Sequence, residues 1–334
     1  MSTTPIVYLS SDPGAPQLTG QVRSLVALLD AVLVNGYGVG INAKTPAGWS
    51  IAFTGTNKRV YRVDPVIGSG TYFRVDDSNA VAGSNARAAY VRAFEAMTGI
   101  DTGVNGCPTV EQMSDGDTWS KSSALSSAAR DWMIVASAKW FYLFVDVNGG
   151  GMSTTVPFIA GDMDSFAPGD RYCFMVSTGL LGAAHSGAAS VTVSQALYGR
   201  NQLNNAVTAN QGGYIMRGRV GSPGAVPIAL PVPRIVGATP VAAVYGGAGG
   251  AYPSTVNNGI FCDDILFREG GSLVRGRMPN CYAPWHDRPL GDLEVKDGLT
   301  GFGGATVIAK SYRALTSSGS NAGQVLFDIS TPVA

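Results

Sequence analysis

The chain has 334 residues, of which 45% are hydrophobic and only 14% are charged, whereas charged residues usually make up about 25% of a globular chain. Lysine plus arginine and aspartate plus glutamate are balanced at 23 each, so no net charge attracts nucleic acid or an anionic membrane surface. A chain with so few charges and no net charge tends to associate. The composition therefore predicts that partner molecules cover much of the surface.

Glycine accounts for 44 residues, nearly twice its usual share of about 7%. The glycines fall between apolar segments rather than in one low-complexity tail, which is typical of short strands joined by tight turns. The first residues lack the basic and apolar regions of a secretory signal, and no run of about 18 apolar residues occurs. We therefore expect a β-rich protein that is made in a cytoplasm and has no membrane anchor.

In chain order, the first predicted element is a short strand at residues 6–9, and the second is a helix at residues 22–34. The helix is predicted because apolar residues recur at the spacing of one helical face. These residues are Val22, Leu25, Val26, Leu29, Val32 and Leu33. Thr19 or Gly20 can begin the helix, and Asn35-Gly36 supplies the left-handed residue that ends it.

After Gly40 the pattern changes to short segments rich in β-branched and aromatic residues, bounded by Gly, Asn, Asp or Pro. Strands are predicted at residues 50–53, 58–63, 71–75, 132–136, 140–146, 172–177, 191–194, 214–219, 234–236, 260–268, 272–275, 306–310 and 324–328. Residues 86–97 are rich in alanine, which favours a helix, yet Tyr90, Arg92 and Phe94 alternate with other residues. We interpret this stretch as a strand that pairs with residues 72–75.

The regular recurrence of turn residues is typical of sandwich-like or barrel-like β architecture. Residues 181–233 are rich in Gly, Ala, Asn and Pro, which indicates a surface excursion and a linker. The predicted organisation is an N-terminal helix with a β-domain over residues 1–180, this linker, and a C-terminal β-domain over residues 234–334. The expected fold class is mainly β, with two associated sandwich-like or barrel-like domains and one amphipathic helix near the N-terminus.

The sequence offers few groups for catalysis. Its 2 histidines are His185, in the small-residue excursion, and His286, which precedes Asp287. A catalytic triad also needs a nucleophile in a constrained turn, and the sequence lacks the G-x-S-x-G motif that supplies one. We therefore predict that His185 lies in an exposed loop and that His286 belongs to a structural turn.

Acidic residues occur in three groups: Asp76-Asp77, Asp263-Asp264, and Asp162 with Asp164. Glycoside cleavage needs two carboxylates at a defined separation across a cleft. Binding of Ca²⁺ by the third group together with Asp170 is a further alternative, although the EF-hand spacing is not met. We interpret all of these groups as turn and strand-end chemistry, because aspartate binds nearby backbone N–H groups.

Two other patterns also favour structural roles. Arg217-Gly218-Arg219 and Arg275-Gly276-Arg277 lie in neutral surroundings, so we expect these arginines to bridge carboxylates across strands or subunits rather than to bind phosphates. The glycine-rich residues 36–40 follow a helix instead of opening one. They are therefore predicted to stop that helix rather than to bind a dinucleotide.

The four cysteines are Cys107, Cys173, Cys262 and Cys281. They form no C-x-x-C pair and match no zinc module. Four cysteines in a chain of this length do not make a disulfide framework, so we predict reduced and mostly buried thiols. Neither a metal nor a cofactor is expected.

Scattered blocks of the sequence are similar to a known family. They begin with Ser-Asp-Pro-Gly-Ala-Pro at residues 11–16 and continue at residues 18–20, 28–31, 33–38, 47–49, 53–58, 60–62, 73–77, 97–103, 158–162, 168–170, 277–279 and 283–290. The blocks cover most of residues 8–175 and 272–312. In them the chain resembles a family of virion structural proteins of tailed bacteriophages. The resemblance implies a structural component of the virion or its tail, and it transfers no catalytic residue to this chain.

Four residues are expected to mediate contacts with partners. Trp49, Tyr282 and Trp285 are large amphipathic side chains, whose usual place is the edge of a core or an interface. Leu29 lies on the apolar face of the predicted helix, where a packed seam is expected.

Together, the sequence and the resemblance predict a non-catalytic structural subunit of a tailed-phage virion, placed in the tail, tail tip or baseplate. A capsid decoration or head–tail joining protein is the alternative within this class, and a receptor-binding or glycan-cleaving tail protein is the alternative from another class. The predicted partners are copies of the chain and other virion proteins, with the host surface added in the receptor-binding alternative. Nucleic acid and membrane are not expected partners. The expected location is the virion, after assembly in the host cytoplasm.

Overall fold

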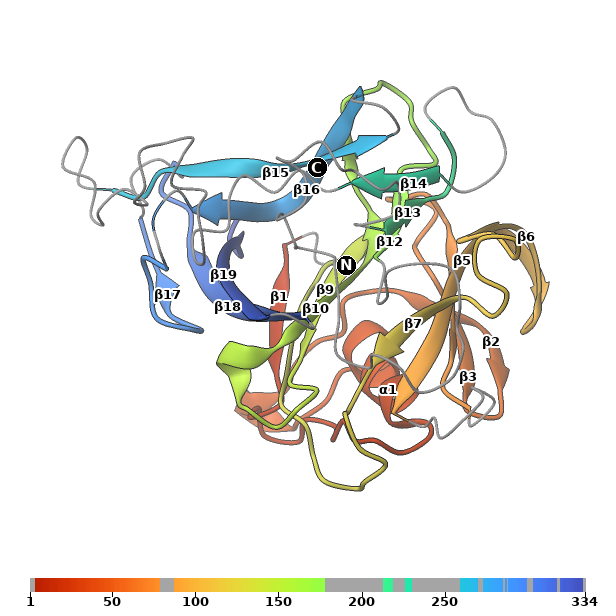
Figure 1. Ribbon diagram of the computed structural model, residues 1–334, viewed down its shortest axis with the longest axis horizontal. Coiled ribbons are helices and arrows are strands. Elements are labelled where there is room, and N and C mark those ends of the chain that lie inside the picture. Colours follow the sequence, from red (N-terminus) through yellow and green to blue (C-terminus); the bar gives the residue numbers. More distant parts are fainter. Residues whose placement is uncertain are drawn as a thin grey trace.

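The computed structural model describes residues 4–78, 87–177, 213–218, 226–229, 259–269, 273–284, 286, 288–298, 303–316 and 319–332. The fold is mainly β, as predicted, and its strands form two antiparallel sheets (Figure 1). In the smaller sheet the strands are β2 (Ser50–Gly55), β3 (Lys58–Arg62), β4 (Tyr72–Asp76), β5 (Ala88–Gly99), β6 (Thr102–Cys107) and β7 (Asp117–Ser120). Their order is β2-β3-β4-β5-β6, with β7 also paired to β5.

The larger sheet contains strands from both ends of the chain. They are β1 (Ile6–Leu9), β8 (Trp132–Ala136), β9 (Trp140–Val145), β10 (Val156–Asp162), β11 (Asp164–Ser165), β12 (Phe174–Ser177), β13 (Gly213–Ile215), β14 (Val226–Ala229), β15 (Cys262–Glu269), β16 (Leu273–Pro284), β17 (Val295–Lys296), β18 (Val307–Thr316) and β19 (Gly319–Asp328). Their order is β1-β8-β9-β10-β12-β13-β14-β15-β16-β19-β18-β17, and β11 pairs with β16.

The central strands of the larger sheet are covered on both faces. In β9, Phe141 and Leu143 pack into a core shared with the smaller sheet and the helix, whereas Tyr142 and Phe144 pack into a second core. Successive side chains of a strand point to opposite faces, so a strand buried on both faces needs an unbroken apolar run. The six apolar residues of β9 meet that requirement.

The second core is closed by the C-terminal strands. Phe267, Met278, Ile308 and Phe327 belong to it, and the ring centroids of Tyr142 and Phe327 are 5.0 Å apart. Strands that are distant in the sheet order, such as β9 and β19, therefore pack face to face, and the larger sheet curls around this core. The two predicted domains thus share one sheet and one core, while the boundaries between them remain a prediction. Part of the predicted linker, β13 and β14, also lies in this sheet, and most of the rest of the linker lies outside the described residues.

The described part of the alanine-rich stretch at residues 86–97 is a strand from Ala88 onward, as we interpreted it. It forms β5, which pairs with β4 so that Tyr72 lies opposite Phe94 and Val75 lies opposite Val91. Val91 belongs to the core between the sheets, and Phe94 belongs to a small cluster on the other face of the smaller sheet. Two-faced packing in the sheet therefore outweighs the helical propensity of alanine.

The helix predicted at residues 22–34 is present, with a different start. It consists of α1 (Ser24–Leu29) and a π-helical continuation, η1 (Asp30–Asn35), and Gly36 ends it with φ 76° as predicted. The predicted apolar positions from Leu25 to Leu33 are buried, whereas Val22 precedes the helix and is 36% exposed. The start predicted at Thr19 or Gly20 is wrong, because a carboxylate from a distant strand binds the first free amides of the helix.

Several strands were not predicted, among them β6, β7 and β10, whereas β1 and β8 coincide with their predictions. The strands predicted at residues 191–194 and 234–236 lie outside the described residues. The turn at residues 55–58 joins β2 to β3, with Asn57 at φ 56°. No helix in the described part of the chain is long and apolar enough to cross a membrane.

Candidate functional site

Two of the residues predicted to contact partners lie in the core of the chain itself. Leu29 is 0% exposed and Trp49 is 3% exposed. The indole N–H of Trp49 donates to the carbonyl of Ser137 at 2.9 Å, and its ring packs edge-on against Phe141. Because both side chains are buried within the chain, they cannot contact a partner molecule and instead stabilise the folded chain. Tyr282 on β16 keeps part of its surface exposed, and Trp285 lies outside the described residues.

The imidazole of His286 binds the backbone just before β15. His286 is 4% exposed, and its Nε2 accepts a hydrogen bond from the backbone N–H of Phe261 at 3.0 Å. The two rings also stack, with centroids 6.2 Å apart. The contact gives His286 a structural role, as predicted, although the residue lies in a β-bridge rather than in the predicted turn. The other histidine, His185, lies outside the described residues.

The arginines at 275 and 277 bridge carboxylates across strands, as predicted. The guanidinium of Arg275 is fully buried and binds both oxygens of Asp170 at 2.9 Å and one oxygen of Glu269 at 2.9 Å. Arg277 lies 3.3 Å from Asp164 and 3.2 Å from Asp264. Three of the acidic residues that we considered for Ca²⁺ or for glycoside cleavage, Asp164, Asp170 and Asp264, are thus engaged with arginines of β16. Among the described residues, no three metal-ligating side chains lie close enough to hold an ion.

A third arginine connects the two sheets. Arg217, which follows β13, binds the carboxylate of Glu95 on β5, and its guanidinium lies 4.0 Å from the centroid of the Tyr172 ring. The neighbouring Arg219 lies outside the described residues. An ion pair of this kind is weak evidence for net stability, and its observed effect is to join the residue after β13 to β5.

The Asp170→Asn variant should be less stable than the wild type at neutral pH, and the difference should shrink in acid. Burial alone would raise the pKa of Asp170, but hydrogen bonds from Arg275 and Ser165 outweigh it and hold the pKa below its usual value. Such a carboxylate stabilises the fold above the unfolded-state pKa of about 4, and the contribution is lost as the pH falls through the folded-state pKa. Urea unfolding of both proteins at neutral pH and at about pH 3 measures this. An equal difference at both pH values would contradict it.

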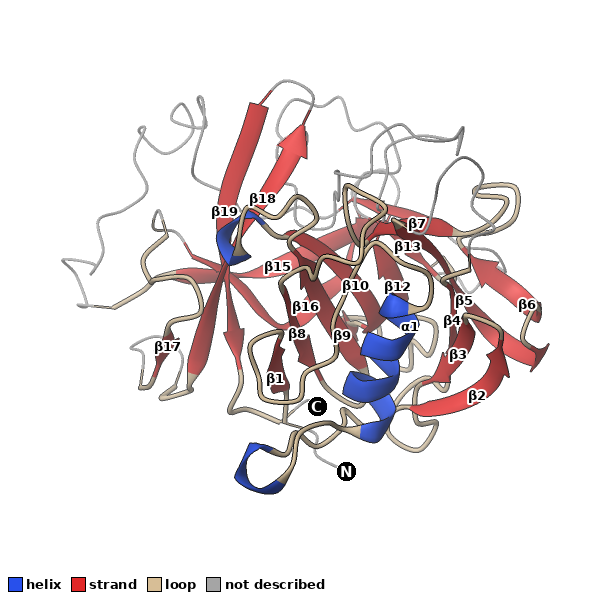
Figure 2. Cartoon of the chain, turned by 90° about the horizontal axis from the view of Figure 1, so that it is seen from below, coloured by secondary structure: helices blue, strands red, loops and turns tan. Residues whose placement is uncertain are grey.

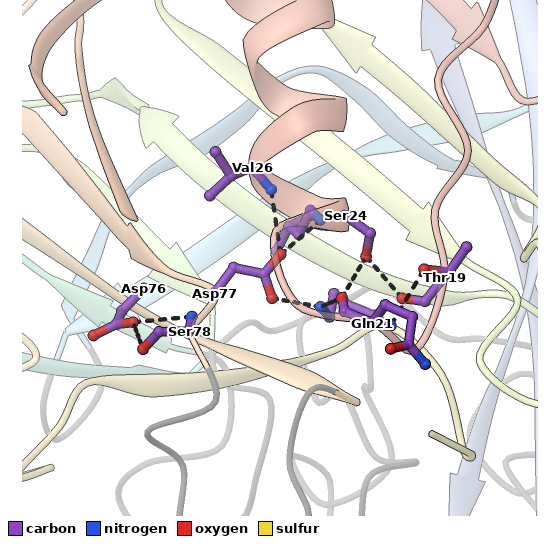
Figure 3. A network of polar contacts seen from close by, with 9 residues as sticks. Thr19, Gln21, Ser24, Val26, Asp76, Asp77 and Ser78 are labelled. Atoms are coloured by element: carbon purple, nitrogen blue, oxygen red, sulfur yellow. Dashed lines mark hydrogen bonds and ion pairs between the residues drawn. The ribbon is translucent and has the colours of Figure 1, made fainter. Parts of the chain in front are cut away.

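The N-terminus of α1 is bound by Asp77, which follows β4 (Figure 3). One carboxylate oxygen of Asp77 accepts hydrogen bonds from the backbone N–H groups of Leu25 at 2.8 Å and Val26 at 3.4 Å. The other oxygen binds the ammonium of Lys121, which also donates to the carbonyl of Gln21 at 2.6 Å. Asp77 is 0% exposed and Lys121 is 1% exposed. Burial raises the pKa of Asp77 to about 6, although Lys121 and the two amides favour the ionised form.

The middle of the helical segment is tied to the smaller sheet. Asp30 accepts a hydrogen bond from the hydroxyl of Tyr61 at 2.9 Å and binds Arg59 at 3.1 Å. Both partners lie on β3. Together with Asp77, these contacts fix the helical segment at its start and at its middle, so the loop that follows it begins from a fixed position.

That loop, residues 36–44, is called the projecting loop. An antiparallel bridge closes its base: the N–H of Tyr37 donates to the carbonyl of Lys44 at 3.1 Å, and the N–H of Lys44 donates back at 2.8 Å. Gly38 has φ 77°, and a Cβ there would lie 2.4 Å from the carbonyl oxygen of Asn42. Only glycine fits this position, because it has no Cβ and tolerates positive φ.

The base of the projecting loop is also fixed by polar contacts. The phenol of Tyr37 donates to Asp12 at 2.6 Å, and the ammonium of Lys44 lies 3.5 Å from the same carboxylate. Burial and the contact with Asp12 raise the pKa of Tyr37 above its usual range. Lys44 also donates to the carbonyl of Val7 in β1 at 3.0 Å. The loop is therefore held against the larger sheet as well as against the helix.

The tip of the projecting loop is apolar and exposed. It contains a 3₁₀ turn, η2 (Gly40–Asn42), which lies at the lower margin of the molecule in Figure 2. Val39 is 84% exposed and Ile41 is 101% exposed. An aliphatic pair on a rigid support is suited to insertion into an apolar pocket of another molecule, because little conformational entropy is lost on binding. This pair was not predicted from the sequence, although two apolar residues near glycines were a visible signal.

Comparisons with known proteins assign no family to this arrangement. No protein-family model matches the chain, and a search of curated proteins finds no match.

Proposed function

We propose that this chain is a non-catalytic structural subunit of a tailed-phage virion, in the tail, tail tip or baseplate. In this role it acts through contacts with copies of itself and with other virion proteins. The resemblance of the sequence blocks to virion structural proteins supports the proposal. The observation that carries it is the exposed aliphatic pair Val39 and Ile41 on a rigid support, in a chain that buries some of its few charges.

Buried cations account for part of the low surface charge. The side chains of Lys121, Arg275 and Lys310 are 0–1% exposed, and each of them binds a carboxylate. Lys310, for example, binds Asp292 at 2.9 Å and the carbonyl of Met152 at 2.6 Å. Cations used in this way do not contribute to repulsion between molecules. A surface with few charges and protruding aliphatic groups favours association.

The test replaces the tip of the projecting loop. We expect a Val39→Ser, Ile41→Ser variant to fold with a stability within about 0.5 kcal/mol of the wild type, because both side chains are solvated. In complementation of a phage null mutant, this variant should be incorporated poorly into particles. Val66→Ser is the matched control, because Val66 is 88% exposed on a different loop. Incorporation of the double variant at the wild-type level would contradict the proposal.

The same complementation assay addresses the alternatives. Asp263→Ala should assemble and infect normally, and His286→Ala should still assemble and infect at a stability cost of about 1 kcal/mol for its lost hydrogen bond, because a structural subunit needs neither group for chemistry. Normal assembly with loss of infection would instead favour a glycan-cleaving or receptor-binding protein. A reconstruction of the whole particle then separates the tail from the capsid and from the head–tail joint, which are the locations of the alternatives within the same class.

A further inference from the structure

Among the described residues, the paths of the two sheets end in four edge strands; β7 and β11 pair off these paths, and β7 is buried throughout while β11 has 2 residues. The larger sheet ends in β1 and β17, and the smaller sheet ends in β2 and β6. An edge strand presents unpaired backbone N–H and C=O groups, which pair readily with a strand of another molecule. Folded proteins usually protect such edges with short strands, lysines, irregular backbone or covering segments.

Three of these edges carry such protection. β1 is only 4 residues long, and the carbonyl of Val7 accepts a hydrogen bond from Lys44. β17 has 2 residues, one of which is Lys296. β6 contains two glycines and has Asn105 at φ 53°, which breaks its extended backbone. None of the three offers a regular apolar ladder to a partner.

The fourth edge, β2, has one of these devices, a bulge between Ile51 and Phe53, and lacks the others. Its 6 residues, Ser-Ile-Ala-Phe-Thr-Gly, include no charge and no proline. Among the described residues, β3 is the only strand paired with it. Figures 1 and 2 both place β2 at the margin of the molecule, on the outside of the smaller sheet. A strand of this composition with a free edge is expected to find a partner strand.

A bulge makes both faces of β2 apolar. The pairing with β3 shifts between Ile51 and Phe53, so that Ile51 lies opposite Tyr61 and Phe53 lies opposite Val60. Tyr61 belongs to the core between the sheets, and Val60 belongs to the cluster on the other face. Ile51 is 36% exposed. A strand that pairs with β2 must therefore be uncharged and apolar on both of its faces.

We propose that β2 pairs in antiparallel orientation with β2 of a second copy of this chain, around a two-fold axis. β2 is itself uncharged and has apolar residues on both faces, as the partner strand must. A two-fold pair of uncharged strands sets no like charges opposite each other. Two of the three cations of the neighbouring strand β3 are bound to carboxylates, and the third, Arg62, lies over the ring of Tyr72 at 4.8 Å. Lys58 is bound to Asp76 at 3.0 Å, and Arg59 is bound to Asp30 at 3.1 Å. This pairing names the surface through which the chain would self-associate, and it rests on the proposed function.

Hydrogen exchange of the purified full chain provides the first test. As the concentration rises from nanomolar to micromolar, the amides of residues 50–55 should become protected, while those of β6 should not change. In parallel, sedimentation should show a dimer. Ile51→Lys should weaken this dimer by at least about a hundredfold, because in a pair centred on Ala52 it sets an unpaired charge against the apolar Phe53 of the second copy. Ile51→Thr, which stays neutral and β-branched, is the matched control and should retain the dimer.

Cross-linking tests the orientation of the pair. An antiparallel pair centred on Ala52 places Ser50 of one copy opposite Thr54 of the other. In a Cys262→Ser background, a mixture of Ser50→Cys and Thr54→Cys chains should therefore cross-link with a short thiol reagent, whereas each variant alone should not. Cys262 is removed because it is only partly buried, whereas the other three cysteines are buried and free.

Three results would overturn this pairing, and they bear differently on the proposed function. Oligomers without protection of β2 would place self-association at another surface and leave the proposed function standing. Protection of β2 in particles but not in the isolated protein would assign the edge to a strand of another virion protein. A monomer at every concentration, with β2 unprotected in particles too, would overturn the pairing and count against self-association as a whole.

Discussion

Leu29→Asp is expected to leave almost no folded protein at room temperature. The side chain of Leu29 is fully buried between the helix and the sheets. Loss of a buried leucine alone costs about 2–5 kcal/mol, and an unpaired buried carboxylate adds several kcal/mol. The sum is comparable to the whole stability of a domain, about 5–15 kcal/mol. Far-ultraviolet circular dichroism and urea unfolding measure the effect.

Leu29→Met is the matched control, because it keeps the volume and apolar character of the site and should cost less than about 1.5 kcal/mol. A Leu29→Asp protein that unfolds at the same urea concentration as the wild type would show that the helix is placed wrongly. Particles assembled with Leu29→Asp should lack this subunit, as a result of unfolding rather than of a lost contact with a partner.

Asp77→Ala is expected to lower the free energy of unfolding by about 3–5 kcal/mol, the usual cost of removing one partner of a buried ion pair. It would leave the ammonium of Lys121 buried without its carboxylate, and it would also free the amides of Leu25 and Val26. Urea unfolding at neutral pH measures this change. A loss below about 1 kcal/mol would contradict the assignment of Asp77 as the cap of the helix.

A double variant separates the effect of the Asp77–Lys121 ion pair from the effect of the hydrogen bonds that cap the helix. Asp77→Asn keeps an acceptor for the helix amides, and Lys121→Met removes the buried cation while keeping a side chain of similar length. The double variant should therefore be more stable than Asp77→Ala, because no unpaired charge remains buried. Non-additivity of the two single changes in a double-mutant cycle would measure the coupling between Asp77 and Lys121.

The cap also shows where sequence reasoning reached its limit. The spacing of apolar residues predicted the buried face of the helix, and alternation predicted β5, since both depend on neighbours along the chain. The start of the helix depends on Asp77, which is 52 residues away from Leu25. A cap supplied from that distance leaves no pattern in the sequence near the helix. Thr19 and Gly20 were therefore predicted as the helix start from neighbouring residues alone.

Strand β10 was missed for a related reason. Pro157 lowers the expectation of a strand, because proline cannot donate to a ladder. In the fold, Pro157 lies opposite Phe144 of β9, whereas β12 on the other side of β10 pairs only with Ala160–Asp162. The missing N–H of Pro157 therefore costs no bond to β12, and how far β12 extends is a property of the fold.

The candidate site was predicted only in part. The bridging roles of Arg217, Arg275 and Arg277 followed from their neutral surroundings, whereas the exposed pair Val39 and Ile41 did not. Apolar character suggests burial in a sequence, and only the glycine-rich base of the projecting loop explains why these two side chains point outward. Leu29 and Trp49 show the opposite error, because apolar residues of the chain's own core were taken for contacts with partners.

The covering of β9 on both faces has a consequence for synthesis of the chain on the ribosome. When β9 emerges, the smaller sheet and the helix have already been made and can cover one of its faces. The other face, with Trp140, Tyr142 and Phe144, has no cover until the strands at residues 262–328 have been translated. During that interval the nascent chain exposes aromatic surface that favours aggregation. We therefore expect slower translation over this stretch, or a chaperone that binds the exposed aromatic face, to raise the yield of native protein.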